Sequence, residues 1–137
     1  MGTIVVGYDA SDCARAALNT AIEVAKALGD DITVVMAYEV SRLGGEVADY
    51  AAALRERADE VVEHATHQAA AAGFEINTMI VEELPAQALV DVADRTDARV
   101  IVVGSRGIHP LQGALVGSTP HKLLQVSHRP VLVVPAG

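Results

Sequence analysis

The stretch that decides the fold is VIVVGSRGIHPLQGALVGSTP, from Val100 to Pro120, in a chain of 137 residues. It opens with four β-branched residues, Val100–Val103, and such a run predicts a strand buried on both faces of a sheet. Gly104 ends this strand, and a loop that contains three further glycines follows it. Pro120 suits the first turn of a helix, where its missing N–H costs little. The stretch therefore predicts a strand, a glycine-rich loop and a helix N-terminus in succession.

The C-terminal part of this stretch favours the binding of an anion. With Ser118 or Thr119 as the expected N-cap, the loop and the helix present unpaired backbone N–H groups and the positive end of a helix dipole, an arrangement that commonly binds phosphate. The charge distribution agrees, because the chain carries a net charge of −8 and yet has no Asp or Glu after Asp97. We interpret the loop as a phosphate site. The alternative is that its glycines only allow a surface loop to turn.

The rest of the chain alternates short apolar runs with segments of helical periodicity. We expect strands at residues 3–8, 32–37, 74–81, 100–103 and 131–134. We expect helices from Ser11 or Asp12 to Gly29, over 47–72, from Pro85 onward, and from about 120 to 126. This order predicts an α/β fold with a parallel sheet and right-handed crossovers, in one domain that spans residues 1–137.

Composition excludes several classes of protein. The single cysteine, Cys13, leaves no intrachain disulfide and no CxxC metal site. No apolar run approaches the ~20 residues that cross a bilayer, and the N-terminus lacks the pattern of a signal peptide, so we expect a cytoplasmic protein without a membrane span. The net charge of −8 argues against nonspecific nucleic-acid binding. The chain also lacks the GxxxxGK(S/T) and GxGxxG motifs of nucleotide-binding proteins.

Asp9 follows the first expected strand as Gly104 follows the fourth. Ligands of open parallel sheets bind at the carboxyl ends of strands, near the point where the strand order reverses. If these two strands are neighbours, Asp9 faces the glycine-rich loop and can accept hydrogen bonds from an adenine amino group or a ribose hydroxyl. The alternative role of Asp9 is to cap the first helix, and the residues alone favour neither role.

Gly104, Gly107, Gly117 and Ser118, spaced G-2x-G-9x-G-S, resemble the nucleotide-binding signature of the universal stress protein family. Three further stretches agree with that family: VVGYDAS, VVGSRG and RPVLVVP. The resemblance covers the whole chain. It implies a five-stranded parallel sheet in the order 3-2-1-4-5 with helices on both faces, a homodimer formed through Val131–Val134, and the branch of the family that binds ATP.

The same resemblance implies roles for eleven residues, carried over by position. Adenine and ribose would lie at Gly7, Tyr8, Asp9 and the backbone of Ala37, the ribose and phosphates at Val103, Gly104, Arg106 and Gly107, and the phosphates at Gly117, Ser118 and Thr119. Mg²⁺ would be held mainly by the phosphates of ATP, and no residue of the chain is expected to act as a metal ligand.

The sequence departs from the family pattern at three places. Pro120 stands where the family usually has Ser or Thr, which removes one hydroxyl and one N–H from the phosphate end. Ala10 replaces the usual Gly after Asp9 and restricts that turn. Leu84 precedes Pro85 where the family often has Asp or Asn, so the third helix is expected to lack a side-chain cap.

Five other residues have side chains that could react or bind a ligand. Cys13 is expected to be a packing residue rather than a reactive thiol, and His64 and His67 a solvated pair without a third metal ligand. His109 and His121 flank the loop and are candidates for phosphate contact.

We therefore expect a cytoplasmic stress-response protein that binds ATP and acts as a nucleotide-dependent regulator or sensor, with an unidentified protein partner. Two alternatives remain open: an ATP-cleaving enzyme of the related adenylating or pyrophosphatase type, and a dimeric adaptor that needs no nucleotide. Hydrolysis requires a group that takes a proton from water, and no carboxylate follows Asp97. We expect no catalytic residue and at most weak ATPase activity.

Overall fold

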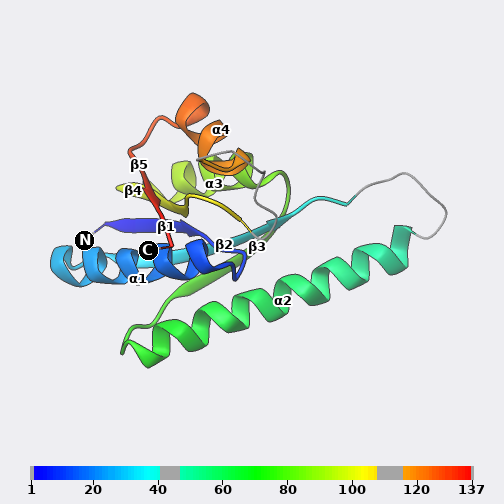
Figure 1. Ribbon diagram of the computed structural model, residues 1–137, viewed down its shortest axis with the longest axis horizontal. Helices are drawn as coiled ribbons and strands as arrows, with labels where there is room; N and C mark the ends of the chain where they lie inside the picture. The colour runs from blue at the N-terminus through cyan, green and yellow to red at the C-terminus, as the bar shows by residue number, and fades with distance from the viewer. Residues whose placement is uncertain (1, 41–46, 108–115, 137) are drawn as a thin grey trace.

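A computed structural model of the chain describes residues 2–40, 47–107 and 116–136. A sheet of five parallel strands lies between two layers of helices (Figure 1). In chain order the elements are β1 (Thr3–Gly7), α1 (Asp12–Leu28), β2 (Asp31–Tyr38), α2 (Val47–Ala71), β3 (Asn77–Glu82), α3 (Pro85–Thr96), β4 (Val100–Gly104), α4 (Ser118–Val126) and β5 (Val131–Val134). The strand order is β3-β2-β1-β4-β5. The predicted fold class and strand order are confirmed.

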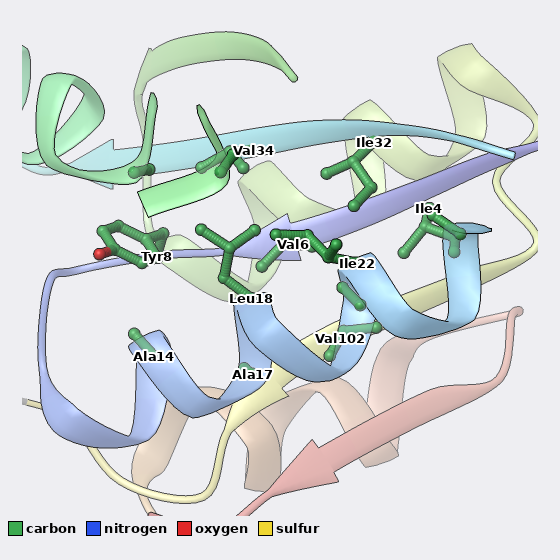
Figure 2. Packing of buried hydrophobic residues seen from close by; sticks show 14 of the residues in the cluster. Ile4, Val6, Tyr8, Ala14, Ala17, Leu18, Ile22, Ile32, Val34 and Val102 are labelled. Carbon is green, nitrogen blue, oxygen red and sulfur yellow. The ribbon is translucent and has the colours of Figure 1, made fainter. Parts of the chain in front are cut away.

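The three central strands, β2, β1 and β4, are buried on both faces, as the sequence predicted for Val100–Val103. Ile4 and Val6 of β1 face α1 and α2, whereas Val5 between them faces α3 and α4. Figure 2 shows Leu18 and Ile22 of α1 packed toward the first of these faces. Alanines recur along the buried stripe of α1, and their small side chains let the helix lie close to the sheet.

The ends of α1 and α3 follow the sequence signals. The Ser11 hydroxyl accepts a hydrogen bond from the Ala14 N–H at 3.2 Å, and Gly29 ends α1 with a φ of 72°. Pro85 is the first residue of α3, and its N-cap, Leu84, provides no side-chain hydrogen bond. The predicted caps of α1 are confirmed, and so is the missing cap of α3.

The predicted start of α4 is wrong. The helix begins at Ser118, and its N-cap is Gly117 rather than Ser118 or Thr119. The Gly117 N–H donates to the Ser105 carbonyl at 2.6 Å, while its own carbonyl accepts from the His121 N–H at 3.2 Å. These two bonds fix the first turn earlier than expected, because Gly117 is held against the end of β4.

Two other boundaries differ from the prediction. Phe74 belongs to the turn that ends α2, since its N–H bonds to the Ala69 carbonyl at 2.9 Å, and β3 begins three residues later. On the apolar face predicted over 47–72, Ala58 is the first position described as buried, and Tyr50 is 50% exposed. Figure 1 shows the reason, because the first half of α2 extends beyond the sheet.

The turn between β1 and α1 holds a strained residue. Ala10 has a φ of 64°, in the left-handed region that favours glycine. The neighbouring Asp9 carboxylate accepts the Ser11 N–H at 3.0 Å, and this bond closes the turn. The turn is therefore maintained by its hydrogen bonds against the preference of alanine.

Replacing Ala10 with Gly is expected to raise the free energy of unfolding by about 0.5–1 kcal/mol. Relief of a left-handed alanine, ~1–2 kcal/mol, exceeds the added entropy of glycine in the unfolded chain, ~0.4–1 kcal/mol. The matched control is Ala27→Gly in an exposed turn of α1, where the same change is expected to cost about 1 kcal/mol. Urea denaturation measures both variants, and an equal loss in the two would show that Ala10 is unstrained.

Candidate functional site

A cavity of about 250 Å³ opens at the carboxyl edge of the sheet. β1 and β4 are neighbours in the centre of the sheet, and the strand order reverses between them. In an open parallel sheet this is the place where ligands bind. The cavity is lined by Gly7, Tyr8, Asp9, Ala14, Val35, Met36, Ala37, Pro85, Leu89, Val103, Gly104, Arg106, Gly107, Gly117, Ser118, Thr119 and Pro120.

All eleven residues that the sequence singled out lie around this one cavity: Gly7, Tyr8, Asp9, Ala37, Val103, Gly104, Arg106, Gly107, Gly117, Ser118 and Thr119. Their roles toward a ligand stay predictions. Sequence reasoning placed Pro120 at the phosphate end but missed the rest of the apolar wall, formed by Ala14, Val35, Met36, Pro85 and Leu89. Pro85 and Leu89 had a usable signal, because the first turn of a helix that follows a parallel strand lies at the carboxyl edge of the sheet.

Asp9 serves the fold and also faces the glycine-rich loop. One carboxylate oxygen, Oδ1, accepts the Ser11 N–H at 3.0 Å. The other, Oδ2, lies so close to Gly107 that a Cβ there would meet it at 2.8 Å. Asp9 therefore does not cap α1, since Ser11 is the N-cap, and one of its oxygens closes the preceding turn while the other lies against the loop. Its role toward a ligand stays a prediction.

Gly104 allows two backbones to approach. A Cβ at this position would lie 2.6 Å from the backbone carbon of Cys13 and 2.9 Å from the Ala14 nitrogen. Any side chain would push the end of β4 away from the first turn of α1. Gly104 is thus needed for packing, in addition to lining the cavity.

Cys13 lies beneath the same contact. It is buried, and its sulfur is 3.6 Å from the Ser105 hydroxyl. This environment agrees with the packing role that the sequence predicted.

The start of α4 provides hydrogen-bond donors at the other end of the cavity. Within the described chain, the N–H groups of Ser118 and Thr119 have no hydrogen-bond partner. The next residue, Pro120, is buried and has no N–H to offer. Two backbone donors, two hydroxyls and the positive end of a nine-residue helix therefore meet at the cavity.

The charged side chains that line the described part of the cavity are Asp9 and Arg106. His121, a candidate for phosphate contact, is exposed, and its Nε2 lies 3.5 Å from the Gln125 amide instead. His109, the other candidate, falls outside the described residues.

A polar cluster connects the cavity to α2. The Tyr8 hydroxyl donates to Gln68 Oε1 at 2.9 Å and lies 3.2 Å from His64 Nδ1. The hydroxyl proton goes to Gln68, so the contact with His64 is a hydrogen bond in the tautomer that carries its proton on Nδ1. Burial raises the pKa of the Tyr8 phenol, which therefore stays protonated. His64 is exposed, as the sequence predicted, and its imidazole also contacts the Tyr8 hydroxyl.

No group of three or more His, Cys, Asp or Glu side chains in the described part of the chain is arranged to hold a metal ion. His67, the second residue of the predicted pair, is exposed and lies 4.0 Å from Glu63. Among the helices that the structure describes, none has the length and apolar character of a membrane-spanning segment.

Comparison with known sequences identifies relatives over nearly the full chain. The model of the universal stress protein family matches residues 1–135. A universal stress protein of Methanocaldococcus jannaschii is 30% identical over 136 aligned residues, covering 96% of this chain and 80% of that protein. Universal stress protein YxiE of Bacillus subtilis is 29% identical, covering 96% of this chain and 97% of its own.

Comparison with solved structures identifies the same family. A universal stress protein from Archaeoglobus fulgidus superposes with a TM-score of 0.79 at 29% identity, covering 98% of each chain. A second structure, a universal stress protein in complex with cAMP, superposes with a TM-score of 0.77 at 29% identity, covering 99% of this chain and 98% of its own.

Proposed function

The chain belongs to the universal stress protein family, and we propose that it binds an adenine nucleotide in the cavity at the carboxyl edge of its sheet. The observation that carries the proposal is that the eleven residues carried over from the family resemblance line one cavity. A relative that is 29% identical is described in complex with cAMP, which supports the class of ligand.

In this proposal the two ends of the cavity hold the two ends of the nucleotide. Asp9 and the backbone of Ala37 bind adenine and ribose, and the N–H and hydroxyl groups of Ser118 and Thr119 bind phosphate. ATP is among the ligands, with Mg²⁺ held mainly by its phosphates, because Asp9 is the one carboxylate that lines the described cavity.

We further propose that the bound nucleotide is a signal rather than a substrate, in a cytoplasmic protein of the stress response. Hydrolysis needs a group placed to take a proton from the attacking water. Asp9 is proposed to lie at the adenine and ribose end, away from the terminal phosphate, and His121 lies outside the lining of the described cavity. The described residues therefore supply phosphate binding without a general base.

The free edge of β5 supports a homodimer as part of the proposal. β5 and β3 are the two edge strands. β5 is entirely apolar, with Leu132 37% exposed, whereas β3 carries Asn77, Thr78 and Glu82. An uncovered apolar edge is prone to aggregation, and pairing with a second copy covers it.

Replacing Gly117 with Val is expected to weaken ATP binding at least tenfold. Even a Cβ would lie 3.3 Å from the Ser105 oxygen and 3.4 Å from the Arg106 Cα, so a branched side chain displaces the loop from the start of α4. Calorimetric titration measures the effect, with Ala52→Val on an exposed position of α2 as the matched control. Unchanged affinity in a folded Gly117→Val protein would remove this loop from the binding site.

Replacing Val133 with Pro is expected to convert a dimer into a folded monomer. The Ile101 N–H bonds to the Pro130 carbonyl and the Ser105 N–H to the Val134 carbonyl, so the even-numbered residues of β5 direct their backbone toward β4. The Val133 N–H therefore points to the free edge, where proline is tolerated in the fold and blocks pairing. Light scattering gives the mass, and Leu132→Pro, which breaks the pairing with β4, is the destabilised control. A monomeric native protein at micromolar concentration would refute the dimer.

ATP turnover is expected to be far slower than ~1 per second, an ordinary enzyme rate. The reason is the missing general base, and the measurement is steady-state phosphate release with Mg²⁺ present. The same rate is expected in His121→Ala. Turnover at enzyme rates that this variant loses would instead establish an ATP-cleaving enzyme.

A further inference from the structure

We propose that Pro120 limits phosphate recognition to a single phosphate group, so that the site binds AMP at least as tightly as ATP. The inference rests on the proposed adenine-nucleotide function and concerns the selectivity of that site. It follows from the donors, the charges and the space at the start of α4.

The start of α4 has an unusual set of donors. The Gly117 N–H donates to the Ser105 carbonyl at 2.6 Å, and the His121 N–H donates to the Gly117 carbonyl at 3.2 Å. Between them, Ser118 and Thr119 keep unpaired N–H groups among the described residues, and Pro120 has none. A helix start usually leaves more backbone donors unpaired than this one does.

Pro120 removes the donor that this helix would otherwise make available. As the third residue of α4 it holds the position whose N–H commonly bonds to the side chain of the N-cap. Here the N-cap is Gly117, which has no side chain, so any other residue at position 120 would leave its N–H unpaired. The buried proline ring places an apolar surface there instead.

The charges that line the cavity do not compensate for this loss. Among the described lining residues the ionised groups are one carboxylate, Asp9, and one guanidinium, Arg106. Each phosphate beyond the first adds negative charge, and the described lining residues include no second cationic side chain that could pair with it. The dipole of α4 is also a local attraction, which falls off within the first turn of the helix.

The size of the cavity agrees with a short ligand. At about 250 Å³ it lies below the ~300–1,000 Å³ of ordinary small-molecule pockets. In the proposed orientation, adenine and ribose lie at the Asp9 end and one phosphate lies at the start of α4, so further phosphates would lie beyond the two unpaired donors. Additional phosphates therefore gain little binding energy.

The test is a series of calorimetric titrations of the native chain with adenosine, AMP, ADP and ATP, each with and without Mg²⁺. We expect AMP to bind at least about tenfold more tightly than adenosine, because a single charge-assisted contact provides about that much affinity. We expect ADP and ATP to bind no more tightly than AMP. ATP that binds tenfold more tightly than AMP overturns the inference and leaves the proposed function standing. Failure of all four ligands to bind overturns both.

Substitution of Pro120 tests its role directly. Pro120→Ala restores only the N–H, and Pro120→Ser restores the N–H and adds a hydroxyl. We expect the ratio of the AMP dissociation constant to that of ATP to rise about tenfold in Pro120→Ser, with a smaller rise in Pro120→Ala. The matched control is Pro135→Ser, an exposed proline outside the cavity lining, which is expected to leave the ratio unchanged. A ratio that stays constant in folded Pro120→Ser overturns the assignment, and the titration series on the native chain decides the selectivity even if the variant fails to fold.

Discussion

The parallel pairing of β1 with β4 is the interaction on which the site depends. Ile4 lies opposite Val100 and Val6 opposite Val102, so the carboxyl ends of two strands that are distant in sequence meet in the centre of the sheet. The turn that holds Asp9 follows one strand and the glycine-rich loop follows the other. The absence of a side chain at Gly104 then lets β4 approach the first turn of α1. The Asp9 turn and the glycine-rich loop are brought to one cavity by this arrangement.

Much of the fold could be predicted because its signals are local. Buried parallel strands have continuous runs of β-branched residues, and Val100–Val103 shows one. Ser11 and Gly29 mark the two ends of α1 because their side-chain and backbone chemistry acts within a single turn. The strand order and the eleven cavity residues came from the resemblance to the universal stress protein family, which the spacing of the glycines and three further stretches indicated. Such spacing is informative because each glycine meets a specific close approach, as Gly107 does with Asp9.

The features that could not be predicted depend on contacts between distant segments. α4 begins at Ser118 because Gly117 is bonded to Ser105, which no local pattern records. The apolar face of α2 continues to Tyr50 in sequence, but burial ends where the sheet ends. The residue type of Ala10 gives no sign of its left-handed conformation, and only the glycine usual at this place in the family pointed to it. Tertiary geometry decided these positions against local preference.

The two ends of the cavity belong to one connected frame. Asp9 Oδ2 lies against Gly107, and the loop that contains Gly107 is bonded through the Ser105 carbonyl to Gly117 at the start of α4. A displacement of the loop therefore moves both the carboxylate end and the helix end. On the other side, the Tyr8 hydroxyl bonds to Gln68 and His64, so the residue next to Asp9 is also connected to α2. The turn after β1, the loop after β4 and α2 are therefore connected by shared contacts. A ligand that spans the cavity would contact the first two segments and, through Tyr8, affect the third.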